Sequence, residues 1–166
     1  MIQSRYLRYI CWTLVVALTL LFAAGAQART KMPRFVLEDV RNGDVLDSRS
    51  LKGQVLLLTF FATWCPPCVD EIPVLIELQE EYRGAGFSVI GMSVDRDKPV
   101  KIARFVKKFG INYPVLLANS KTTMDFGGVY GIPVSFLVNK SGNVVKKYTG
   151  YIKEAILKKD IRMHLN

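Results

Sequence analysis

The chain has 166 residues, half of them hydrophobic, which is enough for one domain with a sizeable core. Its formal net charge is +9, but the basic residues are not interleaved with aromatic ones, which argues against nucleic-acid binding. The absence of internal repeats and low-complexity tracts in the sequence also argues against a repeat architecture.

The first 28 residues have the pattern of a targeting segment. Arg5 and Arg8 precede an apolar run at positions 10–24, and small residues follow at Ala26 and Ala28. This pattern is typical of a signal peptide cleaved after Ala28, but the apolar run also suits a single N-terminal membrane anchor. Both alternatives stay open, and in both of them the domain at residues 29–166 is exported.

The net charge after Ala28 is +7, because the targeting segment contributes two of the nine positive charges. Such a charge could attract an anionic membrane surface or an acidic partner. A solvated helix face is the favoured interpretation, because the basic residues cluster on the polar side of predicted helices. They include Lys101, Arg104, Lys107, Lys108, Lys158 and Lys159.

The first half of the domain is predicted to contain a hairpin, a buried strand and a helix. Short alternating runs at 35–38 and 45–46 flank an Asn-Gly turn, and the apolar run at 55–61 has almost no alternation. Both faces of this second segment should therefore be covered, as in the centre of an α/β sheet. Helical spacing follows at 69–82, where Pro73 should bend the helix near its first turns.

The second half is predicted to continue the same sheet. A strand at 87–94, a helix at 100–109 and a strand at 113–117 form a crossover unit that adds a parallel neighbour to the central strand. A short helix at 122–126, a hairpin of strands at 134–138 and 144–148, and a last helix at about 153–164 follow. The fold class is α/β, with a central mixed sheet flanked by helices.

A Trp-Cys-Pro-Pro-Cys motif lies at the switch from the buried strand to the helix. Cys65 would sit at the helix N-terminus, where the dipole favours a thiolate, so it is the candidate nucleophile. Cys68, one turn further on and less open to solvent, would resolve a mixed disulfide. Pro66 suits the first helical turn and Pro67 stiffens the loop, so the pair should tune the redox poise.

The number of cysteines favours redox chemistry over a structural role. Cys11 lies in the targeting segment, which leaves Cys65 and Cys68 as the only thiols of the domain. Zinc is disfavoured because a structural site wants four ligands and the only histidine, His164, lies near the far end of the chain. No metal is expected, and no cofactor other than a redox-active Cys65–Cys68 disulfide.

These motifs resemble the thioredoxin superfamily, and more closely its TlpA/ResA-like branch of exported thiol-disulfide oxidoreductases. The resemblance rests on residues 60–68, 71–73 and 130–137, and extends over nearly everything after the targeting segment. It implies a thioredoxin fold with an N-terminal β-hairpin and a β-α insert. It also implies that Pro133 is a cis-proline facing the dithiol, although a proline at a strand start would ordinarily be trans. The Ile132 backbone would then dock an extended substrate.

The resemblance also assigns a role to Glu71, the glutamate that this branch carries just after the dithiol. Burial would raise its pKa toward neutrality and let it exchange the proton that thiolate chemistry moves; the alternative is a helix-terminal acid, as Asp70 is. The buried aspartate of thioredoxin itself aligns with Thr59, which leaves Glu71 as the candidate acid. Trp64 is expected to cover the dithiol, a core position being the alternative.

The sequence therefore predicts an exported protein disulfide reductase that works by dithiol exchange. Its partners would be client proteins with disulfides and a membrane thiol-electron donor, with cytochrome c maturation as a common pathway of the family. The predicted location is the periplasm or the outer side of the membrane. Two rivals are a membrane-tethered binding or chaperone module and a thiol peroxidase. The peroxidase is disfavoured because Phe60 and Phe61 stand where the Pro-x-x-x-Thr pattern of peroxiredoxins would begin.

Overall fold

The computed structural model describes residues 30–165, so the predicted targeting segment lies outside the described residues. The domain is built on a five-stranded mixed sheet with the strand order β5-β4-β3-β6-β7. β3 pairs in parallel with β4 and antiparallel with β6, while β4–β5 is a parallel pair and β6–β7 an antiparallel one. The strands are β3 (Val55–Phe61), β4 (Phe87–Ser93), β5 (Val115–Leu117), β6 (Val134–Val138) and β7 (Val144–Thr149).

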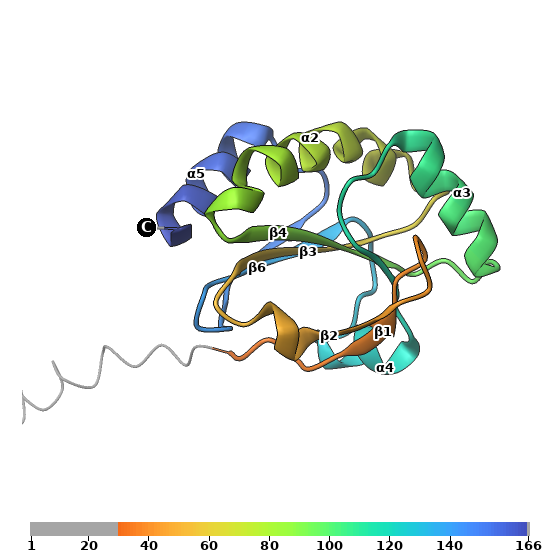
Figure 1. The fold of residues 1–166 in the computed structure, drawn as a ribbon, viewed down its shortest axis with the longest axis horizontal. Coiled ribbons are helices and arrows are strands. Elements are labelled where there is room, and N and C mark those ends of the chain that lie inside the picture. The colour runs from red at the N-terminus through yellow and green to blue at the C-terminus, as the bar shows by residue number, and fades with distance from the viewer. Residues whose placement is uncertain (1–29, 166) are drawn as a thin grey trace, which may run out of the picture.

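Helices lie on both faces of this sheet (Figure 1). The upper face in that view carries the three longer helices, and the lower face carries one short helix together with a separate β1–β2 hairpin. The longer helices are α2 (Pro66–Tyr82), α3 (Pro99–Phe109) and α5 (Glu154–Leu165). The lower layer comprises β1 (Val36–Glu38), β2 (Val45–Asp47), the 3-10 helix η1 (Ser48–Leu51) and α4 (Ser120–Asp125), and a second 3-10 helix, η2 (Arg83–Ala85), follows α2.

The central position predicted for residues 55–61 is confirmed. Every residue of β3 is at most 5% exposed. Leu57 and Phe61 belong to the core cluster that also holds the two cysteines, whereas Leu56 and Phe60 belong to a second cluster on the opposite side. Because alternate residues of a strand face opposite sides of a sheet, β3 supplies both cores.

The element types and the mixed sheet agree with the prediction, while several boundaries differ. Helix α2 begins at Pro66, three residues before its apolar pattern, and Pro66 lies in the first turn as predicted, because a proline at the first helical position loses no helical hydrogen bond. Helix α3 begins with Pro99 for the same reason. Helix α4 starts at Ser120, since the Asn119 side chain accepts a hydrogen bond from the backbone N–H of Thr122 and caps it. Strand β5 is shorter than predicted and includes only Val115–Leu117.

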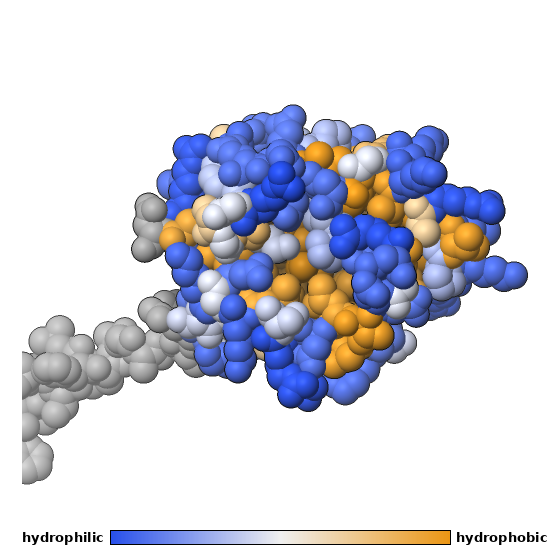
Figure 2. All heavy atoms as spheres, in the orientation of Figure 1, coloured by the Kyte–Doolittle hydropathy of each residue, from blue (hydrophilic) through white to orange (hydrophobic). Residues whose placement is uncertain are grey.

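Figure 2 shows the surface in the same view, which is largely hydrophilic with apolar side chains gathered beside the β1–β2 hairpin. Val36 and Val45 of that hairpin are 48% and 68% exposed. Among residues 30–165, none of the helices has both the length and the apolar character needed to cross a bilayer.

Candidate active site

The two cysteines form a disulfide at the start of helix α2, where the sequence places them. Cys65 is the N-cap residue, with extended backbone, and its carbonyl oxygen accepts hydrogen bonds from the N–H groups of Cys68 and Val69. The Cα atoms of the two cysteines are 5.3 Å apart, within the usual range for a disulfide. The Cys65 sulfur thus lies beside the positive end of the helix dipole, which stabilises a thiolate once the disulfide is reduced.

The two cysteines are almost equally buried in this disulfide form. Cys65 is 4% exposed and Cys68 is 2% exposed, so burial does not separate an attacking from a resolving cysteine as the sequence suggested. Their positions relative to helix α2 distinguish the two roles instead, because only Cys65 precedes the first helical residue. The neighbouring Pro66 and Pro67 are exposed, and Trp64 is 69% exposed, which rules out the core position considered for its ring.

A distant segment of the chain meets the dithiol. The Ile132–Pro133 peptide bond is cis, as the resemblance implied, and Pro133 is buried immediately before β6. The carbonyl oxygen of Ile132 lies 3.9 Å from the Cys65 sulfur. Backbone polar groups of Ile132 are therefore placed next to the sulfur that a substrate would reach.

Glu71 lies one helical turn beyond Cys68, and positions three apart face the same side of a helix. Glu71 is 1% exposed, and its Oε1 accepts a hydrogen bond of 3.0 Å from the backbone N–H of Ile152. Burial raises the pKa of the Glu71 carboxyl from 4.5 to about 7, and the hydrogen bond from Ile152 opposes part of that rise. The direction and the cause of this shift are those expected from the sequence.

A layer of polar side chains lies inside the core on the dithiol side of the sheet. Thr59 and Ser135 are directly paired across β3 and β6, and neither hydroxyl oxygen has a hydrogen-bond partner among the described residues. On the other side Thr59 pairs with Gly91, and a Cβ at Gly91 would be 3.4 Å from the Tyr113 ring. Burial, and to a smaller extent the charge of Glu71, raises the pKa of Tyr113.

The thioredoxin resemblance singled out Thr59 as the position of that protein's buried aspartate, but it did not point to Tyr113. The buried Tyr113 ring lies beside Gly91, where a side chain would come into contact with it. A glycine in the middle of a predicted strand is the signal that could have found it, since such glycines mark a close approach.

Comparison with known proteins agrees with this geometry. The Redoxin family model matches residues 27–161. Thiol-disulfide oxidoreductase ResA of Bacillus subtilis is 34% identical over 125 residues, which is 75% of this chain and 69% of that protein. The chain belongs to the Redoxin family and is ResA-like. ResA of Halalkalibacterium halodurans is 31% identical over 132 residues, covering 80% of this chain and 74% of the relative.

A solved structure gives the same result for the fold. The crystal structure of a thiol:disulfide interchange protein of the thioredoxin family from Chlorobium tepidum superposes with a TM-score of 0.78 at 36% identity. The match covers 85% of this chain and all of that one. This ResA-like protein therefore has the thioredoxin fold and is a thiol-disulfide oxidoreductase.

One further side chain holds the active-site loop of this ResA-like protein, and sequence reasoning missed it. Asp95, two residues after the end of β4, accepts hydrogen bonds from the backbone N–H of Thr63 at 3.1 Å and from the Thr63 hydroxyl at 2.8 Å. Its Oδ2 also accepts a 2.8 Å bond from the Ser93 hydroxyl. The available signal was its place just after a parallel strand, where the loops of such sheets gather.

Metal binding finds no support in the described part of the chain. Within residues 30–165 there is no group of three or more histidine, cysteine or acidic residues that could hold an ion. The expectation that the redox-active disulfide is the only redox group stays a prediction.

Proposed function

We propose that this thiol-disulfide oxidoreductase is exported and reduces disulfides of client proteins outside the cytoplasm. The observation that carries the proposal is the Ile132 carbonyl 3.9 Å from the Cys65 sulfur. A backbone acceptor at that place can pair with an extended client segment while its disulfide is attacked. A module that only holds its clients would need neither thiol.

The exchange proceeds in two steps. The Cys65 thiolate attacks one sulfur of a client disulfide, which forms a mixed disulfide and releases the other client sulfur as a thiolate. The Cys68 thiolate then attacks the Cys65 sulfur, which releases the client as a dithiol and leaves the Cys65–Cys68 disulfide. Two electrons have passed to the client, and Glu71 accepts the proton that Cys68 loses.

A membrane thiol carrier returns the protein to the dithiol form in this proposal. The apolar run at positions 10–24 supports export, either as a cleaved signal or as a retained anchor. Cytochrome c maturation is the pathway proposed for the clients, on the strength of the family resemblance alone.

Trapping clients on a Cys68→Ser variant in intact cells tests the proposal. The variant should accumulate mixed disulfides on Cys65 that a reducing agent releases, and a Cys65→Ser, Cys68→Ser double variant is the matched control. If the double variant traps the same proteins, the complexes are not mixed disulfides and the reductase function fails.

A reductase assay on the purified chain separates the rivals. We expect catalysed insulin reduction with dithiothreitol as the electron source. Consumption of hydrogen peroxide without insulin reduction would instead favour the thiol peroxidase, and client binding unaffected by the double variant would favour the binding module.

A further inference from the structure

A cavity of about 500 Å³ lies away from the dithiol, and five cationic side chains line it. None of the described residues that line it is acidic. Its floor includes apolar side chains, among them the buried Leu56 and Val138. The cations are Lys31, Arg34, Arg49, Lys52 and Lys140.

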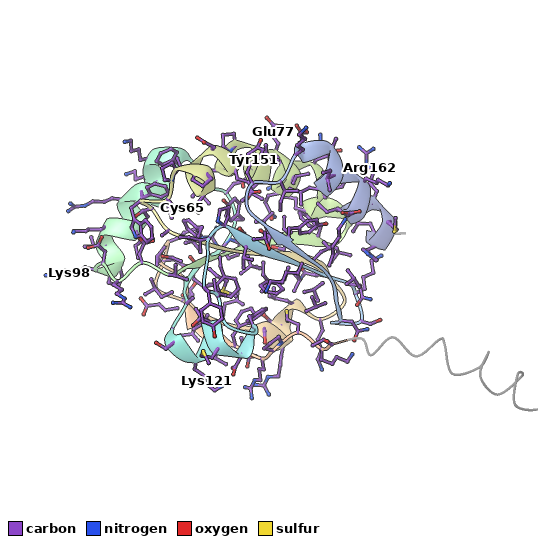
Figure 3. All side chains as sticks on the ribbon, turned by 180° about the vertical axis from the view of Figure 1, so that it is seen from behind. Cys65, Glu77, Lys98, Lys121, Tyr151 and Arg162 are labelled. Atoms are coloured by element: carbon purple, nitrogen blue, oxygen red, sulfur yellow. A yellow bond between two sulfur atoms is a disulfide. The ribbon has the colours of Figure 1, made fainter. Side chains whose placement is uncertain are left out.

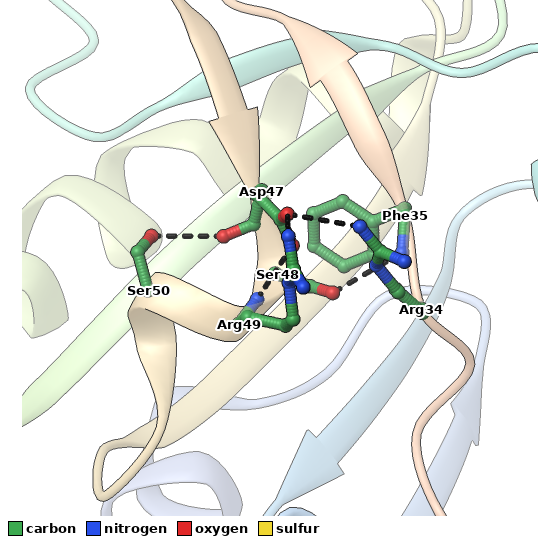
Figure 4. A network of polar contacts seen from close by, with 6 residues as sticks. All are labelled: Arg34, Phe35, Asp47, Ser48, Arg49 and Ser50. Carbon is green, nitrogen blue, oxygen red and sulfur yellow. Dashed lines mark hydrogen bonds and ion pairs between the residues drawn. The ribbon is translucent and has the colours of Figure 1, made fainter.

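Within residues 30–165, a single carboxylate is paired with these five cations. It is Asp47, which forms ion pairs with Arg34 at 3.2 Å and with Arg49 at 2.7 Å (Figure 4). The hydrogen bond from the Arg49 side chain holds the pKa of Asp47 well below its ordinary value, so it stays ionised. Lys31 instead donates to the carbonyl oxygen of Ser141, a neutral partner.

The cavity and the dithiol lie at opposite ends of the central strands. Leu56 near the start of β3 pairs with Val138 at the end of β6, and both line the cavity. Cys65 follows the other end of β3, and a strand of seven residues spans roughly 20 Å. In Figure 3 Cys65 lies left of the middle of the molecule, whereas the described chain begins on the right.

The described chain begins beside this cavity, because Lys31 and Met32 are among its lining residues. The backbone of Thr30 and Met32 is bonded to the turn between β6 and β7: Val144 N–H donates to the Thr30 carbonyl at 2.9 Å, and Met32 N–H donates to Gly142 at 3.0 Å. Only six residue steps separate position 24, the end of the apolar run, from Thr30. Six extended residues reach about 20 Å at most.

We propose that this cavity binds the headgroups of anionic phospholipids and seats the domain on the bilayer with its dithiol pointing away. A cationic rim over an apolar floor matches an anionic amphiphile better than a small hydrophilic anion. The short connection keeps the rim close to the headgroup region when the apolar run is retained in the membrane, so this inference rests on the membrane attachment proposed above. Anionic lipids attract basic residues only within about a Debye length, which the connection permits.

Lysine footprinting of the full chain tests this docking. The chain is reconstituted in nanodiscs of phosphatidylcholine, or of phosphatidylcholine with phosphatidylglycerol, and treated briefly with an amine-acetylating reagent before mass spectrometry. Lys31, Lys52 and Lys140 should be acetylated at least about three-fold more slowly in the anionic discs, with 0.5 M salt removing the difference. Lys98 and Lys107 on the α3 side should react equally in both discs.

Two double variants with the same change in net charge decide whether the site or the overall charge is responsible. Protection of Lys140 should be lost in Lys31→Glu, Lys52→Glu and retained in Lys98→Glu, Lys107→Glu. Equal acetylation in both discs, or equal loss of protection in both variants, overturns the proposal. Protection by inorganic phosphate in neutral discs also overturns it, because the site would then take a small anion.

The footprint is independent of thiol exchange. Insulin reduction is measured on the same samples, so loss of the reductase function and loss of bilayer docking appear as separate results. Both double variants should reduce insulin at the parental rate, because their four positions lie outside the dithiol site, and this also confirms that they fold.

Discussion

Replacing Glu71 by glutamine should remove a pH dependence from the stability of the domain. In the folded protein burial raises the carboxyl pKa to about 7, against 4.5 for the ordinary group. Between these values the folded state keeps a proton that the unfolded state has released, so the free energy of unfolding falls as the pH rises. The stability associated with this group is fully present below pH 4.5 and is lost as the pH passes about 7.

The size of the effect follows from the same two pKa values. Each unit of pKa difference corresponds to about 1.4 kcal/mol, so the parent should lose about 3 kcal/mol of stability across this window because of Glu71. Glutamine has nearly the same shape and can accept the hydrogen bond from the Ile152 N–H, but it cannot ionise. Its buried amide N–H groups lower the free energy of unfolding by about 1 to 3 kcal/mol at every pH, so they do not change how that free energy depends on pH.

Guanidinium unfolding of the disulfide form of both proteins, from pH 4 to pH 9, measures the difference. Other carboxylates titrate in the same way in the parent and in the variant, so their contributions cancel in the difference. Glu81 is one of them, with its pKa lowered to about 2 chiefly by the hydrogen bond from Lys158. The difference in unfolding free energy should change by about 3 kcal/mol between pH 4.5 and pH 7. A constant difference would mean that Glu71 ionises as easily in the folded protein as in the unfolded chain, and the reasoning from its burial would be wrong.

Three further predictions concern the dithiol and the core beneath it. A short iodoacetamide pulse on the reduced protein near neutral pH should label Cys65 well before Cys68, and dominant labelling of Cys68 would reverse their roles. Asp95→Asn keeps an acceptor for the active-site loop but removes a negative charge near it, so Cys65 should be alkylated faster, whereas Asp97→Asn on the exposed loop should leave the rate unchanged. Thr59→Val should raise the free energy of unfolding by about 1 kcal/mol, because it removes a buried hydroxyl with no protein partner; a loss of stability would indicate an internal water on that hydroxyl.

The arrangement of the sheet was predictable because its signals are local. A run of buried apolar residues without alternation, as in β3, requires cover on both faces, and the sequence on each side offers amphipathic helices to provide it. Helix ends were less predictable. The pattern of apolar residues in α2 becomes regular only after Cys68, so periodicity alone misses the first turn of the helix, which Pro66 indicated instead.

The dithiol was predictable for a similar reason, since both thiols lie in one short motif. The groups that surround it come from elsewhere in the chain and have no local pattern. Asp95 reaches Thr63 across 32 positions, and Glu71 receives its hydrogen bond from Ile152 across 81 positions. Such pairs follow from strand order, which brings the ends of β4 and β7 beside the start of α2. Family resemblance supplied Glu71 and Pro133, but it offered nothing for Asp95 or Tyr113.

The buried Glu71 carboxyl also couples proton transfer to the two-electron exchange at the dithiol. In the disulfide form the carboxyl shares the core with two neutral sulfurs, so its proton affinity is set chiefly by burial. Reduction places the ionisable Cys68 thiol one helical turn away from it, and two negative charges in one buried site oppose each other. Glu71 is therefore the best acceptor for the proton that leaves Cys68. Because its pKa lies near neutrality, proton transfer in either direction has only a small free-energy change near neutral pH. In Glu71→Gln that proton must instead go to water, so client exchange should be slower and its pH profile should lose the step near pH 7; an unaltered pH profile would leave Glu71 with a structural role only.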